Sequence, residues 1–417
     1  MIALFAMIAF VTNLCSPMGV IVKNEFHASN FMAMIGNYGN FMAYLVTGFP
    51  AGICIKKFGY KNTALIGLVV GIVGILIQWV SGWGGFVVYL IGALISGACM
   101  CILNTVVNPM LNLLGGGGNT GNQLIQIGGV FNSSAAVAVY IIMGALIGDA
   151  SKAHITDATP ALMIALAIFV IAFIVIFFTK INEPQQPVEE AASGEKDPHS
   201  AFSFRHFNLG ILAIGLYGGI EMGPPGFILQ YLTTAKDALT PGLGMDAGYA
   251  GTLGAVYFIL MLIGRFVGAS VGAKVSTKTM MTVVSSASII LIAAGIFMPE
   301  SSTVSIPGID YVKMSLIWGD VPVSVLFYLL VGLCASVMWG GIFNLATEGL
   351  GKYTAIASGA FMTMVCGFAV MVALQGWVAD ISHSYMTSFF VPLACGVYIL
   401  YYSLIGSKNV NTDIKVD

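Results

Sequence analysis

Apolar residues run along this chain in long blocks, separated for the most part by short polar stretches. A helix that spans a bilayer needs about 20 predominantly apolar residues, and about twelve blocks meet that length. Their approximate limits are 1–22, 30–55, 63–81, 85–113, 123–148, 161–180, 207–233, 247–272, 279–297, 321–346, 352–378 and 385–405. The pattern therefore predicts an all-α membrane protein with about twelve transmembrane helices.

One polar stretch is longer than the others and divides the blocks into two sets of six. It runs from Ile181 to His206 and carries charged residues between positions 189 and 197. We expect an N-terminal six-helix bundle over 1–180, a cytoplasmic linker over 181–206 and a C-terminal six-helix bundle over 207–417.

Composition agrees with a membrane location along the whole chain. Hydrophobic residues make up 58% of it and charged residues 8%, whereas a soluble domain carries about 25% charged residues. The net charge of −2 points to no nucleic-acid partner. The seven cysteines all lie inside apolar blocks, which favours core packing over disulfides or a metal site. The block that starts at Met1 lacks a basic region and a cleavage site, so we expect a retained span.

Basic residues set the orientation, since cytoplasmic loops are enriched in Lys and Arg. With both termini cytoplasmic, twelve of the sixteen lysines and arginines fall on the inner side or at inner helix ends: Lys56, Lys57, Lys61, Lys180, Lys196, Arg205, Arg265, Lys274, Lys278, Lys352, Lys408 and Lys415. The outer side holds Lys23, Lys152, Lys236 and Lys313. Between spans nine and ten we expect a long, exposed outer loop from Pro299 to Asp320.

Glu221 lies halfway along an otherwise apolar segment. An ionised carboxylate at that depth costs at least about 2.5 kcal/mol, so it is expected where it lines a polar pathway, pairs with a cation or carries a proton. The run Gly223–Gly226, which contains Pro224 and Pro225, interrupts a regular helix. A carboxylate beside a broken helix is typical of a solute or ion site in a secondary transporter. The alternative is a protonated Glu that hydrogen-bonds a neighbouring helix.

Two similar segments end the second and the eighth span. GFPAGICIKKFGYK contains Lys57, Gly59 and Lys61, and GRFVGASVGAKVSTK begins with Gly264 and Arg265. Both place closely spaced glycines, which let helices approach, before a short basic loop. We interpret these five residues as gating or structural; Arg265 anchors the gate or extends to the lipid headgroups. The match indicates a duplicated six-helix unit, which is the major facilitator architecture.

Amides and aromatic residues outnumber charges within the spans. Asn104, Asn108 and Asn112 form one helical stripe, which either hydrogen-bonds a polyhydroxylated solute or holds helices together. Further candidate solute contacts are Asn37, Tyr38, Gln126, Asn132, Trp339 and Asn344. These groups favour a neutral hydrophilic solute such as a sugar. All five histidines fall in predicted loops or the linker and no carboxylates pair at depth, so we expect no enzyme.

Several motifs resemble the fucose:proton symporter family of the major facilitator superfamily, which includes bacterial fucose and glucose/galactose permeases. They are PAGICIKKFGYK, LNTVVNP (103–109), FNSS (131–134), IGRFVGA (263–269) and IFNLA (342–346). The resemblance touches both halves. It implies two six-helix bundles around a central cavity that opens alternately to each side.

Four positions depart from that family's pattern. Its fucose symporters have a Glu at Asn104 and an Asp at the position aligned with Ser16, and these carboxylates are the implied proton-coupling groups. The family's cavity Gln falls on Gly129, and Gln126 lies nearly one turn away. Glu221 aligns with a Gln. Proton coupling therefore does not carry over unchanged: either Glu221 takes the role, or the protein is an uncoupled facilitator.

The sequence thus predicts a secondary active transporter of a neutral hexose such as glucose, galactose or fucose, without cofactor, coupled to H⁺ or Na⁺ through Glu221. Carbonyls freed by Pro224 and Pro225 could ligate sodium. A monomer in a bacterial inner membrane is expected. An uncoupled facilitator, a carrier of another polar solute and a non-transporting sugar sensor are the alternatives.

Overall fold

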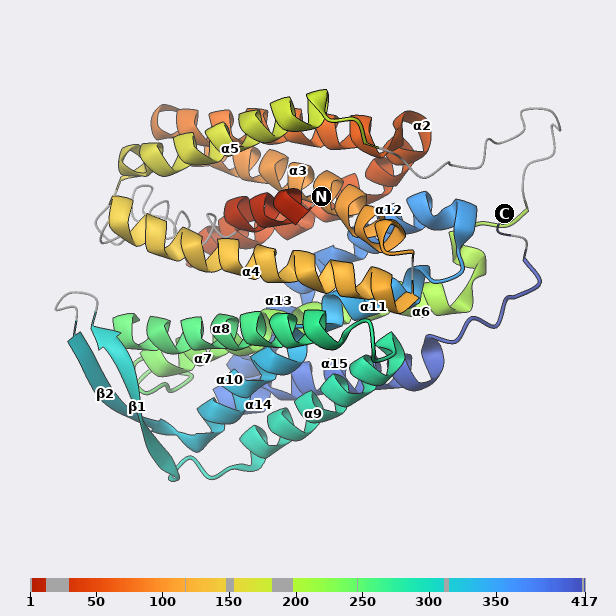
Figure 1. Cartoon of the computed structure of the whole chain (residues 1–417). Helices are drawn as coiled ribbons and strands as arrows, with labels where there is room; N and C mark the ends of the chain where they lie inside the picture. Colours follow the sequence, from red (N-terminus) through yellow and green to blue (C-terminus); the bar gives the residue numbers. More distant parts are fainter. Residues whose placement is uncertain are drawn as a thin grey trace, which may run out of the picture. The chain divides into compact units, whose positions relative to one another are not determined.

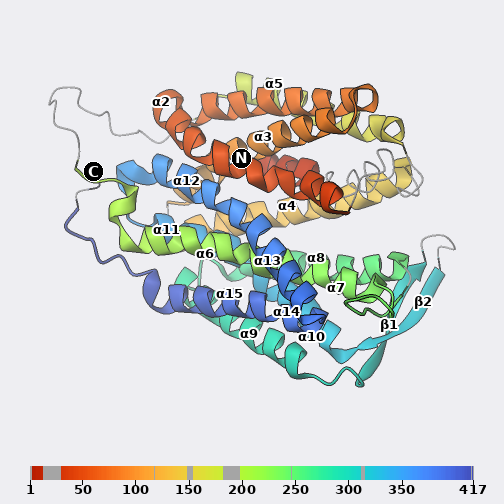
Figure 2. The ribbon, with the colours of Figure 1, turned by 180° about the vertical axis from the view of Figure 1, so that it is seen from behind.

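The computed structural model describes residues 2–12, 30–116, 118–147, 154–181, 198–245, 247–310, 315–414 and 416. The chain groups into two compact units. The first consists of Met1–Asn208, Thr347–Cys366 and Asn409–Asp417, and the second of Leu209–Ala346 and Gly367–Lys408. Figures 1 and 2 show their elements coloured along the sequence. These units do not follow the boundaries 1–180, 181–206 and 207–417, which stay a prediction.

The first unit contains an N-terminal helix and the elements α2 to α5. The helix spans Ile2–Thr12, and the others are α2 (Asn30–Gly84), α3 (Phe86–Leu114), α4 (Gly118–Ile147) and α5 (Thr159–Phe178). Within α2 the backbone leaves helical geometry at Gly59, with φ 80° and ψ 174°. This left-handed conformation favours glycine. The kink separates the two spans that were predicted over 30–55 and 63–81.

One helix from the C-terminal part of the sequence belongs to this first unit. It is α12 (Thr354–Thr363), which packs against α2. A Cβ added at Gly359 would lie 2.6 Å from the carbonyl oxygen of Gly48 and 2.8 Å from the Cα of Gly52. The two backbones therefore approach closely where glycines face each other.

The second unit holds most of the remaining helices. They are α6 (Arg205–Glu221), whose first turn belongs to the first unit, α7 (Gly223–Thr233), α8 (Ala247–Val271), α9 (Thr277–Phe297), α10 (Val323–Ala335), α11 (Met338–Thr347), α13 (Gly367–Ser382), α14 (Tyr385–Ser388) and α15 (Phe390–Tyr401). A π turn, Tyr402–Gly406, follows α15. The core of this unit is aromatic, with Tyr217, Tyr257, Tyr328 and Phe389 fully buried.

The described helices match the predicted spans. Nine helical stretches of the described chain are long and apolar enough to cross a membrane, and one of them, Asn40–Gly84, is 45 residues long. At about 1.5 Å per residue that stretch suffices for two crossings, one on each side of Gly59. With α4 and the N-terminal helix, every predicted span falls at least in part on a helix.

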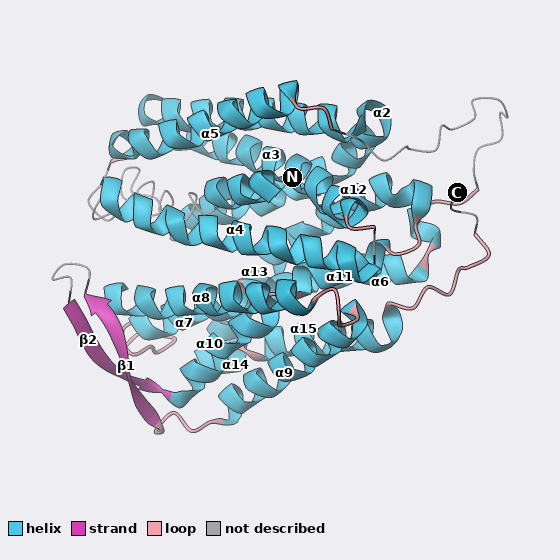
Figure 3. Ribbon diagram, in the orientation of Figure 1, coloured by secondary structure: helices cyan, strands magenta, loops and turns pink. Residues whose placement is uncertain are grey.

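The segment between α9 and α10 forms strands where we expected a loop. It forms an antiparallel hairpin of β1 (Thr303–Asp310) and β2 (Ser315–Pro322), drawn in magenta in Figure 3. The hydroxyl of Tyr249, at the start of α8, donates to the carbonyl oxygens of Ile306 at 2.9 Å and Gly319 at 3.0 Å. The two strands satisfy each other's backbone groups, and Tyr249 fixes them to α8.

His206 also differs from its predicted place in the linker. It is the second residue of α6 and is fully buried. Its Nε2 lies 3.0 Å from the carbonyl oxygen of Glu348. The polar run before it, rich in charged residues, hid the beginning of this helix. Residues 182–197 of the predicted linker lie outside the described part of the chain.

Candidate functional site

The predicted break beside Glu221 is present. Helix α6 ends at Glu221, Met222 separates the two helices, and α7 begins at Gly223 with prolines in its first turn. Because Pro224 has no N–H, it leaves the carbonyl of Ile220, four residues earlier, without its helical donor. The hydroxyl of Tyr257 supplies that hydrogen bond at 2.7 Å. One of the carbonyls that we expected to be free for a sodium ion therefore already accepts a bond.

A second break lies in the same unit, between α10 and α11. Helix α10 ends at Ala335 and α11 begins at Met338. The hydroxyl of Tyr217 donates to the carbonyl of Ala335 at 3.0 Å, and Ser336 Oγ donates to the carbonyl of Leu333 at 2.5 Å. No proline marks this break, so the sequence did not predict it. The sequence feature that could have indicated it is the Gly340–Gly341 pair just beyond the break, since helices often kink at such pairs.

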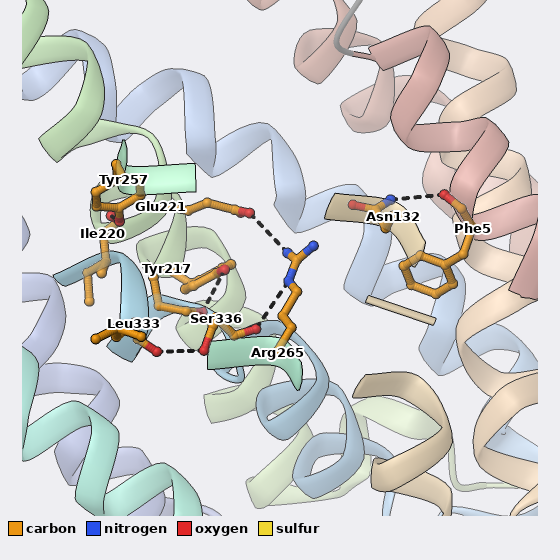
Figure 4. Close-up of polar contacts among 10 residues, drawn as sticks. Phe5, Asn132, Tyr217, Ile220, Glu221, Tyr257, Arg265, Leu333 and Ser336 are labelled. Atoms are coloured by element: carbon orange, nitrogen blue, oxygen red, sulfur yellow. Dashed lines mark hydrogen bonds and ion pairs between the residues drawn. The ribbon is translucent and has the colours of Figure 1, made fainter. Parts of the chain in front are cut away.

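Arg265 joins the two breaks. Its Nη2 lies 3.6 Å from Oε1 of Glu221, and its Nε donates to the carbonyl of Ser336 at 3.3 Å. The side chains of Arg265 and Glu221 are 10% and 12% exposed. Figure 4 shows the guanidinium between the carboxylate of Glu221 and the backbone of Ser336. The interpretation that Arg265 extends to the lipid headgroups is therefore wrong, since its charge is directed at a buried acid.

This pair sets the electrostatics of the site. Removing one partner of a buried ion pair leaves an uncompensated charge, which costs about 3–5 kcal/mol. Glu221 in its ionised form thus depends on Arg265, and Arg265 depends on Glu221.

Gly264 lets α8 come close enough for this contact. A Cβ at position 264 would lie 2.7 Å from the carbonyl oxygen of Leu333 and would overlap the side chain of Ser336. Backbone atoms cannot yield as a flexible side chain can. The structural role that we expected for Gly264 is therefore to let α8 pack directly against the second break.

Two further candidates lie just beyond that break, on α11. Trp339 is half-buried, and its ring centroid lies 6.5 Å from that of Tyr217 and 6.1 Å from that of Phe368. Asn344 is buried, and its Oδ1 accepts a hydrogen bond from Thr277 at 3.1 Å. Glu221, Arg265 and Trp339 therefore belong to one cluster, which Tyr217 connects, whereas Asn344 bonds to α9.

Two amides of the stripe, Asn104 and Asn108, are buried in α3. Nδ2 of Asn104 donates to the hydroxyl of Tyr44 at 3.0 Å, and Nδ2 of Asn108 donates to the backbone carbonyl of Asn104 at 2.8 Å. The first bond connects α3 with α2. Helix packing is therefore part of what Asn104 does, and Tyr44 is a partner that the sequence did not indicate.

The candidates on α4 make local and interhelical contacts. Nε2 of Gln126 lies 3.4 Å from Oδ1 of Asn122, one turn earlier. Nδ2 of Asn132 donates to the carbonyl of Phe5 at 3.0 Å, a contact with the N-terminal helix that is visible in Figure 4. The side chains of Asn37 and Tyr38, and all of Ser16, lie outside the described residues.

The two lysines beside Gly59 differ in their surroundings. Nζ of Lys61 donates to the carbonyls of Phe177 at 3.0 Å and Thr179 at 2.9 Å, at the carboxyl end of α5. Lys57 is exposed. A cation at a helix C-terminus opposes the negative end of the helix dipole. Lys61 therefore holds the carboxyl end of α5.

Comparison with known proteins assigns the fold. The profile of the Major Facilitator Superfamily matches residues 1–374. The chain belongs to the Major Facilitator Superfamily. It is therefore a multi-pass membrane transporter and not an enzyme.

Several curated members of this superfamily resemble the chain over nearly its whole length. A glucose/galactose transporter of Brucella abortus biovar 1 (strain 9-941) is 27% identical over 97% of this chain and 93% of its own. A putative glucose/galactose transporter of Helicobacter pylori (strain J99 / ATCC 700824) is 28% identical, covering 97% and 95%. The L-fucose-proton symporter of Escherichia coli (strain K12) is 21% identical, covering 97% and 92%.

Solved structures confirm the fold. The transporter FucP in the outward conformation has a TM-score of 0.78 at 19% identity, covering 98% of this chain and 99% of that one. The proton:xylose symporter XylE has a TM-score of 0.70 at 12% identity, covering 98% and 95%. The predicted architecture, a helical membrane protein with the major facilitator fold, is confirmed.

Proposed function

We propose that this protein is a secondary active transporter of a neutral hexose that works by alternating access and is coupled to a cation through Glu221. One observation carries the coupling. An ionisable carboxylate inside a membrane span lies at a helix break, where a buried arginine contacts it at 3.6 Å. Ionisable residues at such positions mark ion and proton pathways.

The sugar substrate is supported by two separate considerations. The predicted spans are rich in amides and aromatic residues, which suit hydroxyl groups and the apolar face of a sugar ring. Relatives that align over 97% of the chain are named as glucose/galactose transporters and as an L-fucose-proton symporter. Asn104, Asn108, Gln126, Asn132 and Trp339 are the contacts we propose, with Asn37, Tyr38 and Asn344 as further candidates.

Coupling through Glu221 fits the departures from the family. Asn104 stands where the resemblance implies a proton-carrying Glu, so the acid at position 221 is the group we assign. In the cation-free carrier Arg265 neutralises Glu221. A proton or a sodium ion at the carboxylate takes over that role. To use a gradient, the bound cation must raise the affinity for sugar, and the sugar must raise the affinity for the cation by the same factor.

Uptake into proteoliposomes tests the proposal. Purified wild type and Glu221→Gln are reconstituted, and uptake of radiolabelled glucose, galactose and fucose is measured with proton and sodium gradients imposed separately. We expect gradient-driven accumulation by the wild type and its loss in Glu221→Gln, with equilibration retained. Asp380→Asn, which removes an exposed carboxylate of the same unit, is the matched control and should accumulate sugar normally.

The outcomes separate the alternatives. Equilibration without accumulation, unaffected by Glu221→Gln, would identify an uncoupled facilitator. Sugar binding without flux would identify a sensor. If the wild-type proteoliposomes take up none of the three hexoses, the substrate is another polar solute. For the cellular setting we propose a monomer in a bacterial inner membrane with both termini cytoplasmic, because twelve of the sixteen basic residues then face inward.

A further inference from the structure

The two helix breaks of the second unit share a single arginine. Nη2 of Arg265 contacts the carboxylate of Glu221 at the end of α6, and Nε contacts the carbonyl of Ser336 between α10 and α11. Two nitrogens of one rigid, planar group thus reach two different helix breaks. A change at one contact must alter the geometry available to the other.

Tyrosines connect the same two breaks. Tyr217 lies one turn before Glu221 on α6 and donates to the carbonyl of Ala335, the last residue of α10. Its ring lies 5.7 Å from that of Phe368 and 6.5 Å from that of Trp339, between ring centroids. Trp339 is three residues beyond Ser336, so the break that Arg265 holds sets the position of this tryptophan.

We propose that Arg265 is a positioning residue of the transport cycle, which makes the break between α10 and α11, and with it Trp339, respond to the charge on Glu221. While Glu221 is ionised, the guanidinium is held between the carboxylate and Ser336. When a cation or proton neutralises Glu221, the guanidinium loses this attraction and shifts relative to the carbonyl of Ser336. The contact at Ser336 then changes, and Trp339 moves with the start of α11. This inference rests on the proposed coupling role of Glu221.

The emission of Trp339 reports this movement directly. It is obtained from the full-length protein in detergent as the difference between each variant and the same variant carrying Trp339→Phe. The protein is titrated with acid and, separately, with sodium chloride in exchange for choline chloride. We expect the emission of the wild type and of Lys236→Gln to shift; Lys236 is an exposed cation of the same unit and serves as the control.

The decisive variant is Arg265→Lys. Lysine keeps the positive charge beside Glu221 but offers one nitrogen in place of a planar fork. We expect this variant to bind sugar, while its cation-dependent shift falls at least severalfold. If Arg265 serves only as a counter-charge, Arg265→Lys will shift as the wild type does, and the proposal is wrong.

A second variant leaves the arginine intact and guards against failure of Arg265→Lys to fold. In Glu221→Gln the side chain is neutral at every pH, so its Trp339 emission should be fixed at the cation-saturated position of the wild type. Emission fixed at the cation-free position would overturn the proposal. Absence of any shift in the wild type would overturn it as well. Uptake by the same preparations tells a failure of this inference from a failure of the proposed function. If sugar accumulation depends on Glu221 but the emission of Trp339 does not shift, only the link through Arg265 is rejected. If accumulation does not depend on Glu221, the coupling role of Glu221 is rejected as well.

Discussion

The hydroxyl of Tyr257 donates to the carbonyl oxygen of Ile220 at 2.7 Å. This carbonyl lies four residues before Pro224, which has no N–H to offer it. A side chain on α8 thus completes the backbone hydrogen bonding that the proline removes from α6. The break beside Glu221 is therefore part of a packed interior, and its geometry depends on a tyrosine 36 residues along the chain from the acid.

Replacing this tyrosine should weaken the break without altering its charge. In Tyr257→Phe the Ile220 carbonyl loses its donor, and we expect a loss of about 0.5–1.5 kcal/mol in the free energy of unfolding. Thermal unfolding in detergent measures the change. Tyr401→Phe, which removes the hydroxyl of an exposed tyrosine on α15, should have little effect. Equal unfolding temperatures for the two variants would contradict the role of Tyr257.

A methyl group at position 264 should separate α8 from the second break. In Gly264→Ala the new Cβ would lie 2.7 Å from the backbone oxygen of Leu333, and such overpacking costs about 1–3 kcal/mol. Because Arg265 is the next residue, we also expect gradient-driven uptake to fall. Gly254→Ala, on the same helix, has nothing within 4 Å of the added Cβ. Because alanine favours a helix more than glycine does, it should be at least as stable as the wild type and transport sugar as the wild type does. A matching loss of stability in Gly254→Ala would mean that the close approach at Gly264 is not the cause.

The pair of lysines beside Gly59 offers another matched comparison. Lys61→Gln removes a cation from the carboxyl end of α5, where Nζ contacts two backbone carbonyls. We expect the free energy of unfolding to fall by about 0.3–1 kcal/mol, with the loss smaller at high salt because ions screen the interaction. Lys57→Gln removes an exposed cation from the same segment and should be neutral. Chemical denaturation at two salt concentrations checks both variants, and a salt-independent loss in Lys61→Gln would argue against the dipole contact.

Asn104 can be tested for its two proposed roles separately. Its amide donates to Tyr44, so Tyr44→Phe removes the packing bond and keeps the amide, whereas Asn104→Ala removes both. A hydrogen bond contributes about 1 kcal/mol, so a sugar contact predicts a KM for uptake roughly fivefold higher in Asn104→Ala. Tyr44→Phe should lower the free energy of unfolding and leave the KM for uptake nearly unchanged. If both variants lose stability alike and neither changes KM, Asn104 serves helix packing alone.

Local sequence signals made the break beside Glu221 predictable, whereas the break between α10 and α11 carries no such signal. Two consecutive prolines cannot continue a helix, wherever the chain goes next. Between α10 and α11 no residue forbids a helix; the break is completed by Tyr217 and Arg265, which lie more than 70 residues away. The strands β1 and β2 were not predicted for a related reason, because they are stabilised by each other and by Tyr249.

The sequence by itself determined the membrane location, the positions of the spans and the presence of an acid within one of them. These follow from hydrophobicity, helix length and the cost of a charge in a bilayer, which act on each segment independently. Only the tertiary structure decided which groups meet: Glu221 with Arg265, Arg265 with Ser336, and Asn104 with Tyr44. Such pairings depend on how helices distant in the sequence pack together, and a one-dimensional pattern of apolar and polar residues does not encode which side chains then come within hydrogen-bonding distance.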